Sequence, residues 1–151
     1  MMKQPSLDEQ YQAFESIALS AFGTELLRHS LLPELFGKDS AGLLYWAGKQ
    51  LARRYPLATL EDIAAFFERA GWGTISIGEE RKDELHIELS GPIISARLSL
   101  YDDCTFQLEA GFLAQQIEQQ KRFVTEAVEM PSKQAGKARI LVKWDRKQSI
   151  D

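Results

Sequence analysis

The sequence has 151 residues, of which 44% are hydrophobic and 26% are charged, and its formal net charge at neutral pH is −4. These proportions are typical of an ordinary globular protein rather than a disordered or membrane chain. The negative balance argues against a nucleic-acid partner, because clustered Lys and Arg side chains bind nucleic acids. The length suffices for a buried core, so we predict one domain over residues 1–151.

The sequence also favours a cytoplasmic protein over a secreted scaffold. Its single cysteine cannot form a disulfide within the chain, and no charged-then-apolar leader precedes residue 7. The uncharged stretches at residues 16–24 and 41–48 are far shorter than the roughly 20 residues that span a bilayer. We therefore expect no membrane span.

A long first helix is predicted over residues 8–32. Apolar residues between Tyr11 and Leu27 recur mostly three and four positions apart, as on one face of a helix. Pro33 lacks an amide donor, so the helix should end or bend there.

Two further helices are predicted before the chain changes character. The second covers residues 41–55 and can be capped by Asp39 or Ser40. The third begins after Thr59, which is followed three residues later by an acidic residue, as in a capping box. Gly71 is its natural end.

After Gly73 the apolar period changes from 3.6 to 2, which indicates strands. Residues 74–77 and 85–90 alternate between apolar and polar, and a polar turn at residues 78–83 joins them. This pattern predicts a hairpin with one face in water. Residues 93–101 form an ambiguous extended stretch.

The last part of the chain predicts one helix and a second hairpin. The helix covers residues 105–120, and the strands cover residues 123–130 and 138–144. The order is therefore three helices, a hairpin, one helix and a hairpin. The predicted fold class is α+β, with an antiparallel sheet of about four strands covered on one face by helices.

Gly111 lies inside the predicted helix 105–120, where glycine costs about 1 kcal/mol relative to alanine. A close neighbour would justify that cost. Either the backbone of another element or a ligand lies against Gly111, and packing is the simpler interpretation because helix packing exists in any version of the fold.

The lone Cys104 precedes the same helix and has three interpretations. A helix N-terminus can lower the pKa of a thiol, as a nucleophile requires. The carboxylates of Asp102 and Asp103 oppose that effect, and unpaired cysteines are usually buried packing residues. We therefore favour a structural role over a ligand-pocket wall, and a pocket wall over a nucleophile.

No pattern in the sequence indicates metal binding or catalysis. His29 and His86 are far apart in the chain, and no close pair of ligands with zinc-like spacing is present, although haem ligation by either histidine stays open. No glycine-rich phosphate loop occurs. We expect no cofactor, no metal and no enzymatic activity.

Aromatic residues suggest a surface beyond the core. Neighbours on a helix diverge by about 100 degrees, so Phe66 and Phe67 cannot both face one narrow stripe. The second surface would be a dimer contact, a cavity wall or the underside of the sheet. Phe14, Phe22 and Leu27 on the first helix favour a homodimer contact. The residues expected to line an apolar pocket are Trp46, Phe67, Cys104, Gly111, Phe112 and Leu113.

Four blocks of the sequence resemble a known family. LLYWAGKQLARRYP (residues 43–56), FFERAGWGTI (66–75), ELSGPIISARL (88–98) and FQLEAGFLAQQIE (106–118) closely resemble, in this order, the uncharacterised YslB-like proteins of Bacillus and relatives. More distantly, the chain is similar to the vinyl-reductase domain and to the small Bet-type subunits of the TRAPP complex.

The resemblance implies an α+β fold, a helix-mediated dimer and an elongated apolar cavity for a hydrophobic ligand. The matching positions are Gly48, Leu51, Ala52, Gly71, Gly73, Cys104, Gly111, Phe112 and Leu113. Vinyl-reductase domains often carry further cysteines in the last hairpin, and the TRAPP relatives carry an acylated cysteine before the third helix. Residues 124–142 and 54–59 contain no cysteine, so neither a metal site nor lipidation is expected.

These observations favour a non-enzymatic cytoplasmic binding module, a homodimer with an apolar pocket for a small hydrophobic ligand. The alternative is a protein-protein interaction scaffold with a filled core and no ligand. A cysteine-dependent enzyme is a third hypothesis, which would require a reactive thiol at Cys104.

Overall fold

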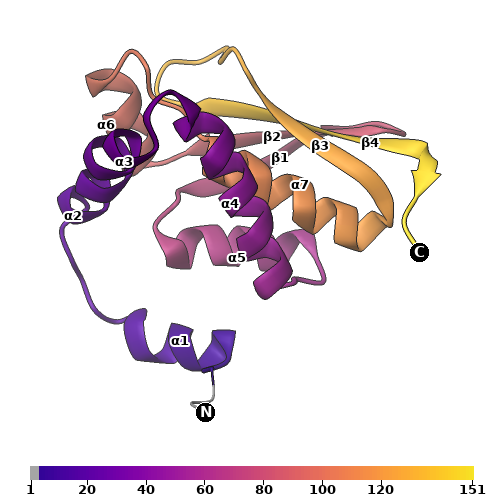
Figure 1. Cartoon of the computed structure of the whole chain (residues 1–151), viewed down its shortest axis with the longest axis horizontal. Coiled ribbons are helices and arrows are strands. Elements are labelled where there is room, and N and C mark those ends of the chain that lie inside the picture. Colours follow the sequence, from indigo (N-terminus) through magenta and orange to yellow (C-terminus); the bar gives the residue numbers. More distant parts are fainter. Residues whose placement is uncertain (1–3) are drawn as a thin grey trace.

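The computed structural model describes residues 4–151 and combines a four-stranded antiparallel sheet, of order β1-β2-β4-β3, with helices on one face (Figure 1). The predicted fold class is confirmed. Among the described residues no helix is both long enough and apolar enough to cross a bilayer. The elements are α1 (Leu7–Phe14), α2 (Phe22–Glu25), the π-helix η1 (Leu26–Leu31), α3 (Leu32–Phe36), the short 3-10 helix η2 (Gly37–Asp39), α4 (Ser40–Arg54), α5 (Leu60–Ala70), β1 (Thr74–Glu80), β2 (Glu84–Ser90), α6 (Pro92–Leu100), α7 (Gln107–Lys121), β3 (Phe123–Met130) and β4 (Ala138–Ser149).

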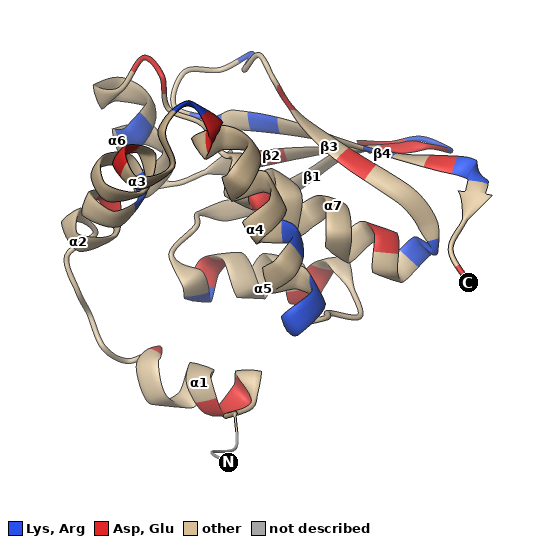
Figure 2. Cartoon of the chain, viewed as in Figure 1, with Lys and Arg blue, Asp and Glu red and all other residues tan. Residues whose placement is uncertain are grey.

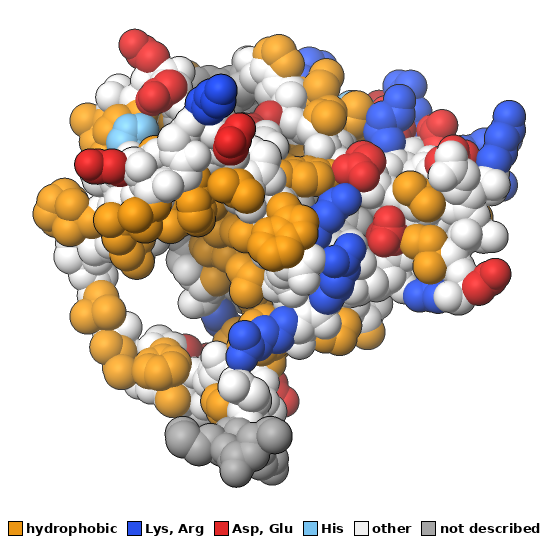
Figure 3. Space-filling model, in the orientation of Figure 1, with side chains coloured by type: hydrophobic (Ala, Val, Ile, Leu, Met, Phe, Trp, Pro, Cys, Tyr) orange, Lys and Arg blue, Asp and Glu red, His pale blue; other side chains and the backbone are white. Residues whose placement is uncertain are grey.

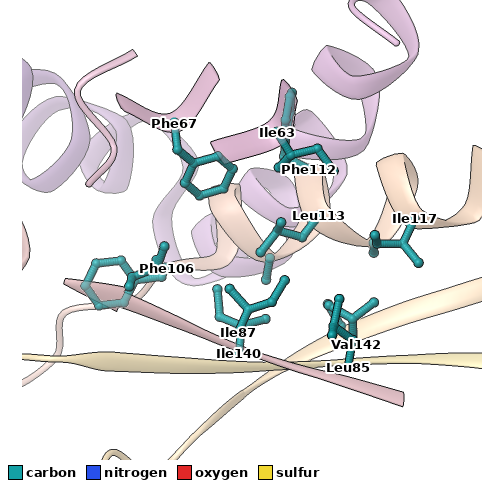
Figure 4. Close-up of a cluster of buried hydrophobic side chains, with 14 of the residues drawn as sticks. Ile63, Phe67, Leu85, Ile87, Phe106, Phe112, Leu113, Ile117, Ile140 and Val142 are labelled. Atoms are coloured by element: carbon teal, nitrogen blue, oxygen red, sulfur yellow. The ribbon is translucent and has the colours of Figure 1, made fainter. Parts of the chain in front are cut away.

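The sheet has one face in the core and one in water, as the alternating pattern predicts. In β2 and β4, Ile87 lies opposite Ile140, and Leu85 lies opposite Val142. All four side chains are buried and point toward α7 (Figure 4). Acidic and basic positions are interspersed along the strands (Figure 2). Both predicted hairpins are present, and β4 continues to Ser149, beyond the predicted end at residue 144.

The central element is α7, which packs on the sheet with one side and on α4 with another. Its residues 109–117 are all buried. Figure 4 shows Leu113 and Ile117 turned toward the sheet, while Phe112 lies near Ile63 and Phe67 of α5. A helix enclosed on all sides explains why its sequence mixes small, aromatic and amide side chains rather than following one apolar stripe.

Amide side chains at the end of α7 hold the loop between α4 and α5. The buried Gln116 accepts a hydrogen bond from the Leu57 amide at 3.0 Å and donates one to the Tyr55 carbonyl at 2.8 Å. Gln120 donates to the Leu57 carbonyl at 2.9 Å. These bonds pair backbone groups that the loop around Pro56 leaves free.

The prediction of one helix over residues 8–32 is wrong. The chain leaves the helix after Phe14 and re-enters it at Phe22, followed by the π-helix η1 and then α3. The two parts dock on different sites: Tyr11 of α1 lies against Phe66 of α5, whereas Arg28 of η1 binds α7. One straight helix cannot reach both sites, so the segment between them is not helical.

Residues 93–101 are also not extended, because α6 occupies Pro92–Leu100. Gly91 has a φ of 115°, a conformation that favours glycine, and it ends β2 there. Proline is well suited to the first position of a helix, so Pro92 starts α6 rather than breaking the chain. Its buried residues Ile94 and Arg97 lie three apart, on one helix face.

Other predicted helix ends are confirmed. The Thr59 side chain accepts a hydrogen bond from the Asp62 amide at 3.0 Å and caps α5. Gly71, with a φ of 74°, ends α5 in the left-handed conformation. The helix predicted over residues 41–55 begins at Ser40 and ends at Arg54.

Candidate functional site

The close approach at Gly111 is made by the backbone of α4. A Cβ atom on Gly111 would overlap the carbonyl oxygen of Tyr45, and a Cβ atom on Gly48 would overlap the carbonyl oxygen of Leu108. Each glycine thus receives the backbone of the opposite helix. Gly48 and Gly111 set the distance between α4 and α7, and the space beside Gly111 is filled by protein.

The structure brings only some of the expected pocket residues together. Phe67, Phe112 and Leu113 are fully buried in the core, and the ring centroids of Phe67 and Phe112 lie 5.9 Å apart. Trp46 lies instead on the surface with 59% of its area exposed, and Cys104 is only partly buried. Rings of α5 and α7 therefore fill the region where the sequence indicates a pocket.

Phe66 and Phe67 are both buried, and both rings contact Phe112 of α7 and Trp72. This pair therefore does not form the separate second surface expected from the sequence. Phe66 contacts Tyr11 of α1 at a centroid distance of 6.5 Å and stacks on Phe112 at 4.6 Å. Tyr11 of α1 and Tyr55 thus complete the burial of Phe66, which Phe112 and Trp72 contact from the core.

Cys104 has the environment of an unreactive thiol. Burial raises its pKa, and the positive charge of Arg97 only partly offsets this effect. His29 stacks on Tyr101 with ring centroids 3.5 Å apart, and His86 contacts Glu84 at 2.8 Å. Within residues 4–151 no group of three or more His, Cys, Asp and Glu side chains is arranged to hold a metal ion.

A buried ion network joins the N-terminal helices to α6 and α7. Both oxygens of the fully buried Glu109 carboxylate accept hydrogen bonds from Arg28, each at 2.7 Å. Arg97 lies 3.3 Å from Glu25 and 3.8 Å from Glu109, and it donates a hydrogen bond to the Thr105 carbonyl at 3.1 Å. Four charged side chains from α2, η1, α6 and α7 thus meet in one place.

The network is charged and structural. Burial works to lower the pKa of Arg28, but the adjoining Glu109 carboxylate outweighs it and raises that pKa above its ordinary value. Removing one partner would leave a buried charge uncompensated. These residues were not predicted from the sequence, although a signal was present: Glu109 and Arg97 are single charges inside apolar stretches, where an unpaired charge would be costly.

Large hydrophobic side chains remain exposed on the N-terminal helices and on α4. In Figure 3 they gather in a band, with Lys and Arg side chains along one border. We call this surface the apolar face; its members are Phe14, Ile17, Leu19, Phe22, Leu26, Leu27, Leu31, Leu35, Phe36, Leu43 and Trp46. Exposed hydrophobic side chains that gather in this way are typical of an interaction site.

A separate hollow lies between three segments of the chain. It has a volume of about 610 Å³ and is lined by residues from the segments 19–24, 68–74 and 92–96. We call it the Ala96 pocket. Most of its lining side chains are small: Ser20, Ala21, Thr24, Gly71, Gly73, Thr74 and Ala96. None of the six pocket residues expected from the sequence lines it.

Comparison with known proteins places the chain in a family. The family described as "Protein of unknown function (DUF2507)" matches residues 21–143. The chain belongs to this family. It is 45% identical over 136 residues to the uncharacterized protein YslB of Bacillus subtilis (strain 168), covering 90% of this chain and 92% of that protein. The resemblance seen in the sequence is confirmed, and α1 lies ahead of the residues that the family description matches.

Solved structures support the fold assignment. A vinyl-4-reductase family protein from Methanocaldococcus jannaschii matches 92% of this chain and 88% of its own, with a TM-score of 0.67 and 18% identity. The phenol-responsive sensory domain of the transcription activator PoxR, solved with phenol, matches 85% of this chain and 76% of its own, with a TM-score of 0.59 and 15% identity. A trafficking protein particle complex subunit 3 from Naegleria fowleri matches 94% of this chain and 96% of its own at 11% identity, but its TM-score of 0.45 is too low to support the fold.

Proposed function

We propose that this chain is a non-enzymatic binding module of the cytoplasm, that it works as a homodimer, and that it holds a small hydrophobic ligand. The apolar face is the observation that carries the proposal. In a monomer, Leu27, Leu35 and Trp46 would stay in water with more than half of their areas exposed. A second copy would bury the same face symmetrically, as in most soluble homo-oligomers.

The ligand part of the proposal is supported by the Ala96 pocket and by analogy. The PoxR sensory domain, which is similar in fold, is described with phenol bound. An apolar pocket of several hundred Å³ with a few polar groups is the usual form of a small-molecule site. The partly buried thiol supports a non-enzymatic role, because a raised pKa keeps Cys104 protonated near neutral pH.

Native mass spectrometry of the protein purified from its own host tests both parts. We expect the mass of two chains, together with an extra small mass that is lost when the same sample is denatured. A monomer without any additional mass would overturn the proposal.

A protein-protein interaction scaffold without a ligand is the second candidate. It is favoured by the filled core, in which Phe67 and Phe112 are fully buried and packed against each other. For a scaffold we expect a dimer that carries no small molecule, and one dominant protein in a pull-down from the host. Loss of that protein in the Leu27→Asp variant would place its contact on the apolar face.

A further inference from the structure

We propose that the homodimer is held together by an exchange of N-terminal arms, in which α1 of each copy docks on α5 of the other. We call α1 together with the linker of residues 15–21 the N-terminal arm. A single chain docks α1 on its own α5, and a dimer offers the same site on the second copy. The inference rests on the proposed homodimer and adds which segment each copy gives to its partner.

The site that receives α1 is specific. Tyr11 of α1 contacts Phe66 with ring centroids 6.5 Å apart, and the Arg69 guanidinium lies 4.4 Å from the centroid of the Tyr11 ring. Arg69 also lies 3.4 Å from the Glu15 carboxylate, at the start of the linker. These contacts define where α1 binds, and they are the same whether its two sides belong to one chain or to two.

The α1 helix is a self-contained unit. The Ser6 hydroxyl accepts a hydrogen bond from the Glu9 amide at 3.1 Å, and the Glu9 carboxylate accepts one from the Ser6 amide at 2.9 Å. This reciprocal cap joins residues that move with α1, so it is kept wherever the arm docks. Every residue of α1 is also at least partly exposed, so α1 can leave its site without opening the core.

The linker stands off its own body. Every residue from 15 to 21 is exposed, and Figure 3 shows open space between the linker, placed as in Figure 1, and the rest of the chain. Residues 19–21 border the Ala96 pocket, a hollow of about 610 Å³. Among the described residues the linker's hydrogen bonds are local, such as that from the Ile17 amide to the Phe14 carbonyl at 3.0 Å. Packing on its own copy therefore does not fix the route of the linker.

Apolar side chains on the arm favour exchange over docking within one chain. Phe14, Ile17 and Leu19 have 67%, 55% and 87% of their areas exposed. An arm that returns to its own body leaves these side chains in water, as in the single chain. An arm that crosses to the second copy runs between the two bodies, where the same side chains are removed from water.

The linker also leaves the body at the surface through which the second copy is proposed to bind. It ends at Ala21, and Phe22, Leu26 and Leu27 of the apolar face follow directly. In a symmetric dimer formed through this face, each arm therefore begins next to the other copy. Exchange keeps every docking contact of α1, so its cost is small.

Bismaleimide crosslinking between α1 and α5 tests the exchange. In a Cys104→Ala background, which removes the single native thiol, Glu15→Cys and Arg69→Cys place thiols on the two sides of the docking contact. We expect bismaleimidoethane to trap the double variant as a covalent dimer. The two single variants, refolded together from urea, should also give a covalent dimer. As much product from either single variant alone would contradict the assigned contact.

The pair of Lys121 with Glu80 supplies the control. These side chains lie 3.8 Å apart and join α7 to β1 inside one body. We expect the Glu80→Cys/Lys121→Cys variant, in the same background, to be linked only within a chain. An internally linked monomer of the Glu15→Cys/Arg69→Cys variant would overturn the exchange, and so would the absence of any link in that variant while the control pair is linked.

A second test uses the linker itself. Leu19→Ser removes an apolar side chain that the exchange buries, and Leu100→Ser makes the same change at the end of α6, at a residue with 71% of its area exposed. We expect Leu19→Ser to raise the dissociation constant of the dimer at least tenfold and Leu100→Ser to leave it unchanged. Equal constants for the two variants would contradict an arm that lies between the copies.

Sedimentation velocity under native conditions separates this inference from the homodimer itself. A dimer in which α1 is linked within each chain would overturn the exchange and leave the homodimer standing. A monomeric unmodified chain would overturn both.

Discussion

Glu109 is the residue whose role is most sharply defined. It is fully buried, and its charge is balanced mainly by the paired hydrogen bonds from Arg28. Glu109→Gln keeps the shape but removes the charge, which leaves Arg28 and Arg97 with Glu25 as their remaining partner. We expect urea unfolding to show a loss of about 3–5 kcal/mol.

The exposed pair of Glu79 with Arg81 supplies the control. Its two charges lie 3.0 Å apart, but both side chains are largely in solvent. We expect Glu79→Gln to leave the unfolding free energy nearly unchanged, because water screens such pairs. Equal losses in the two variants would mean that the buried network does not hold the N-terminal helices.

The thiol of Cys104 gives a pH-dependent prediction. Its pKa is raised by burial, so at pH 8 it has a smaller thiolate fraction than an exposed thiol. We expect iodoacetamide at pH 8 to react more slowly with Cys104 of the folded protein than with the thiol of free glutathione. The reaction rate of Cys104 should still rise at higher pH. In concentrated urea the two rates should converge. If the folded protein were alkylated faster than glutathione, the result would support a catalytic role for the Cys104 thiol.

At the scale of elements, the crossing of α4 and α7 is set by two glycines. Gly111→Ala would drive a methyl group into the Tyr45 backbone, so the helices must separate. We expect a loss of about 1–3 kcal/mol in thermal or urea unfolding. Gly42→Ala, also in α4, meets nothing within 4 Å and should stabilise the protein by up to about 1 kcal/mol. The opposite order of the two variants would contradict this packing.

The sequence patterns that proved correct are those in which one element has one environment. The hairpin residues alternate because one face of the sheet is in water, and α4 has a single buried stripe. The prediction of one helix over residues 8–32 was wrong because two short helical segments that dock at separate sites share one apolar period. The helix α6 was predicted as an ambiguous extended stretch, since a glycine followed by a proline usually interrupts an element, although here Gly91 and Pro92 start a helix.

The candidate site was harder to predict from the sequence for a similar reason. Apolar character marks both Phe112 and Trp46, but only tertiary packing decides that Phe112 is filled core and Trp46 is surface. The small residues of the Ala96 pocket carry no periodic signal, since they come from three separate segments. The ion network left a readable trace in Glu109 and Arg97, because single charges in apolar stretches need partners.

At the scale of the whole molecule, the apolar face is the feature that a monomer would leave exposed to water. The ion network holds the part of this face on α2 and η1 against α6 and α7 (Figure 3). We propose that a second copy covers it. Leu27, with 54% of its area exposed, belongs to this face, whereas Val128, with 50% exposed, lies on β3 outside it.

Sedimentation velocity of the unmodified chain, Leu27→Asp and Val128→Asp tests this claim most directly. We expect the unmodified chain and Val128→Asp to sediment as dimers, and Leu27→Asp to sediment as a folded monomer. A monomeric unmodified chain, or a Leu27→Asp variant that remains dimeric, would contradict the account.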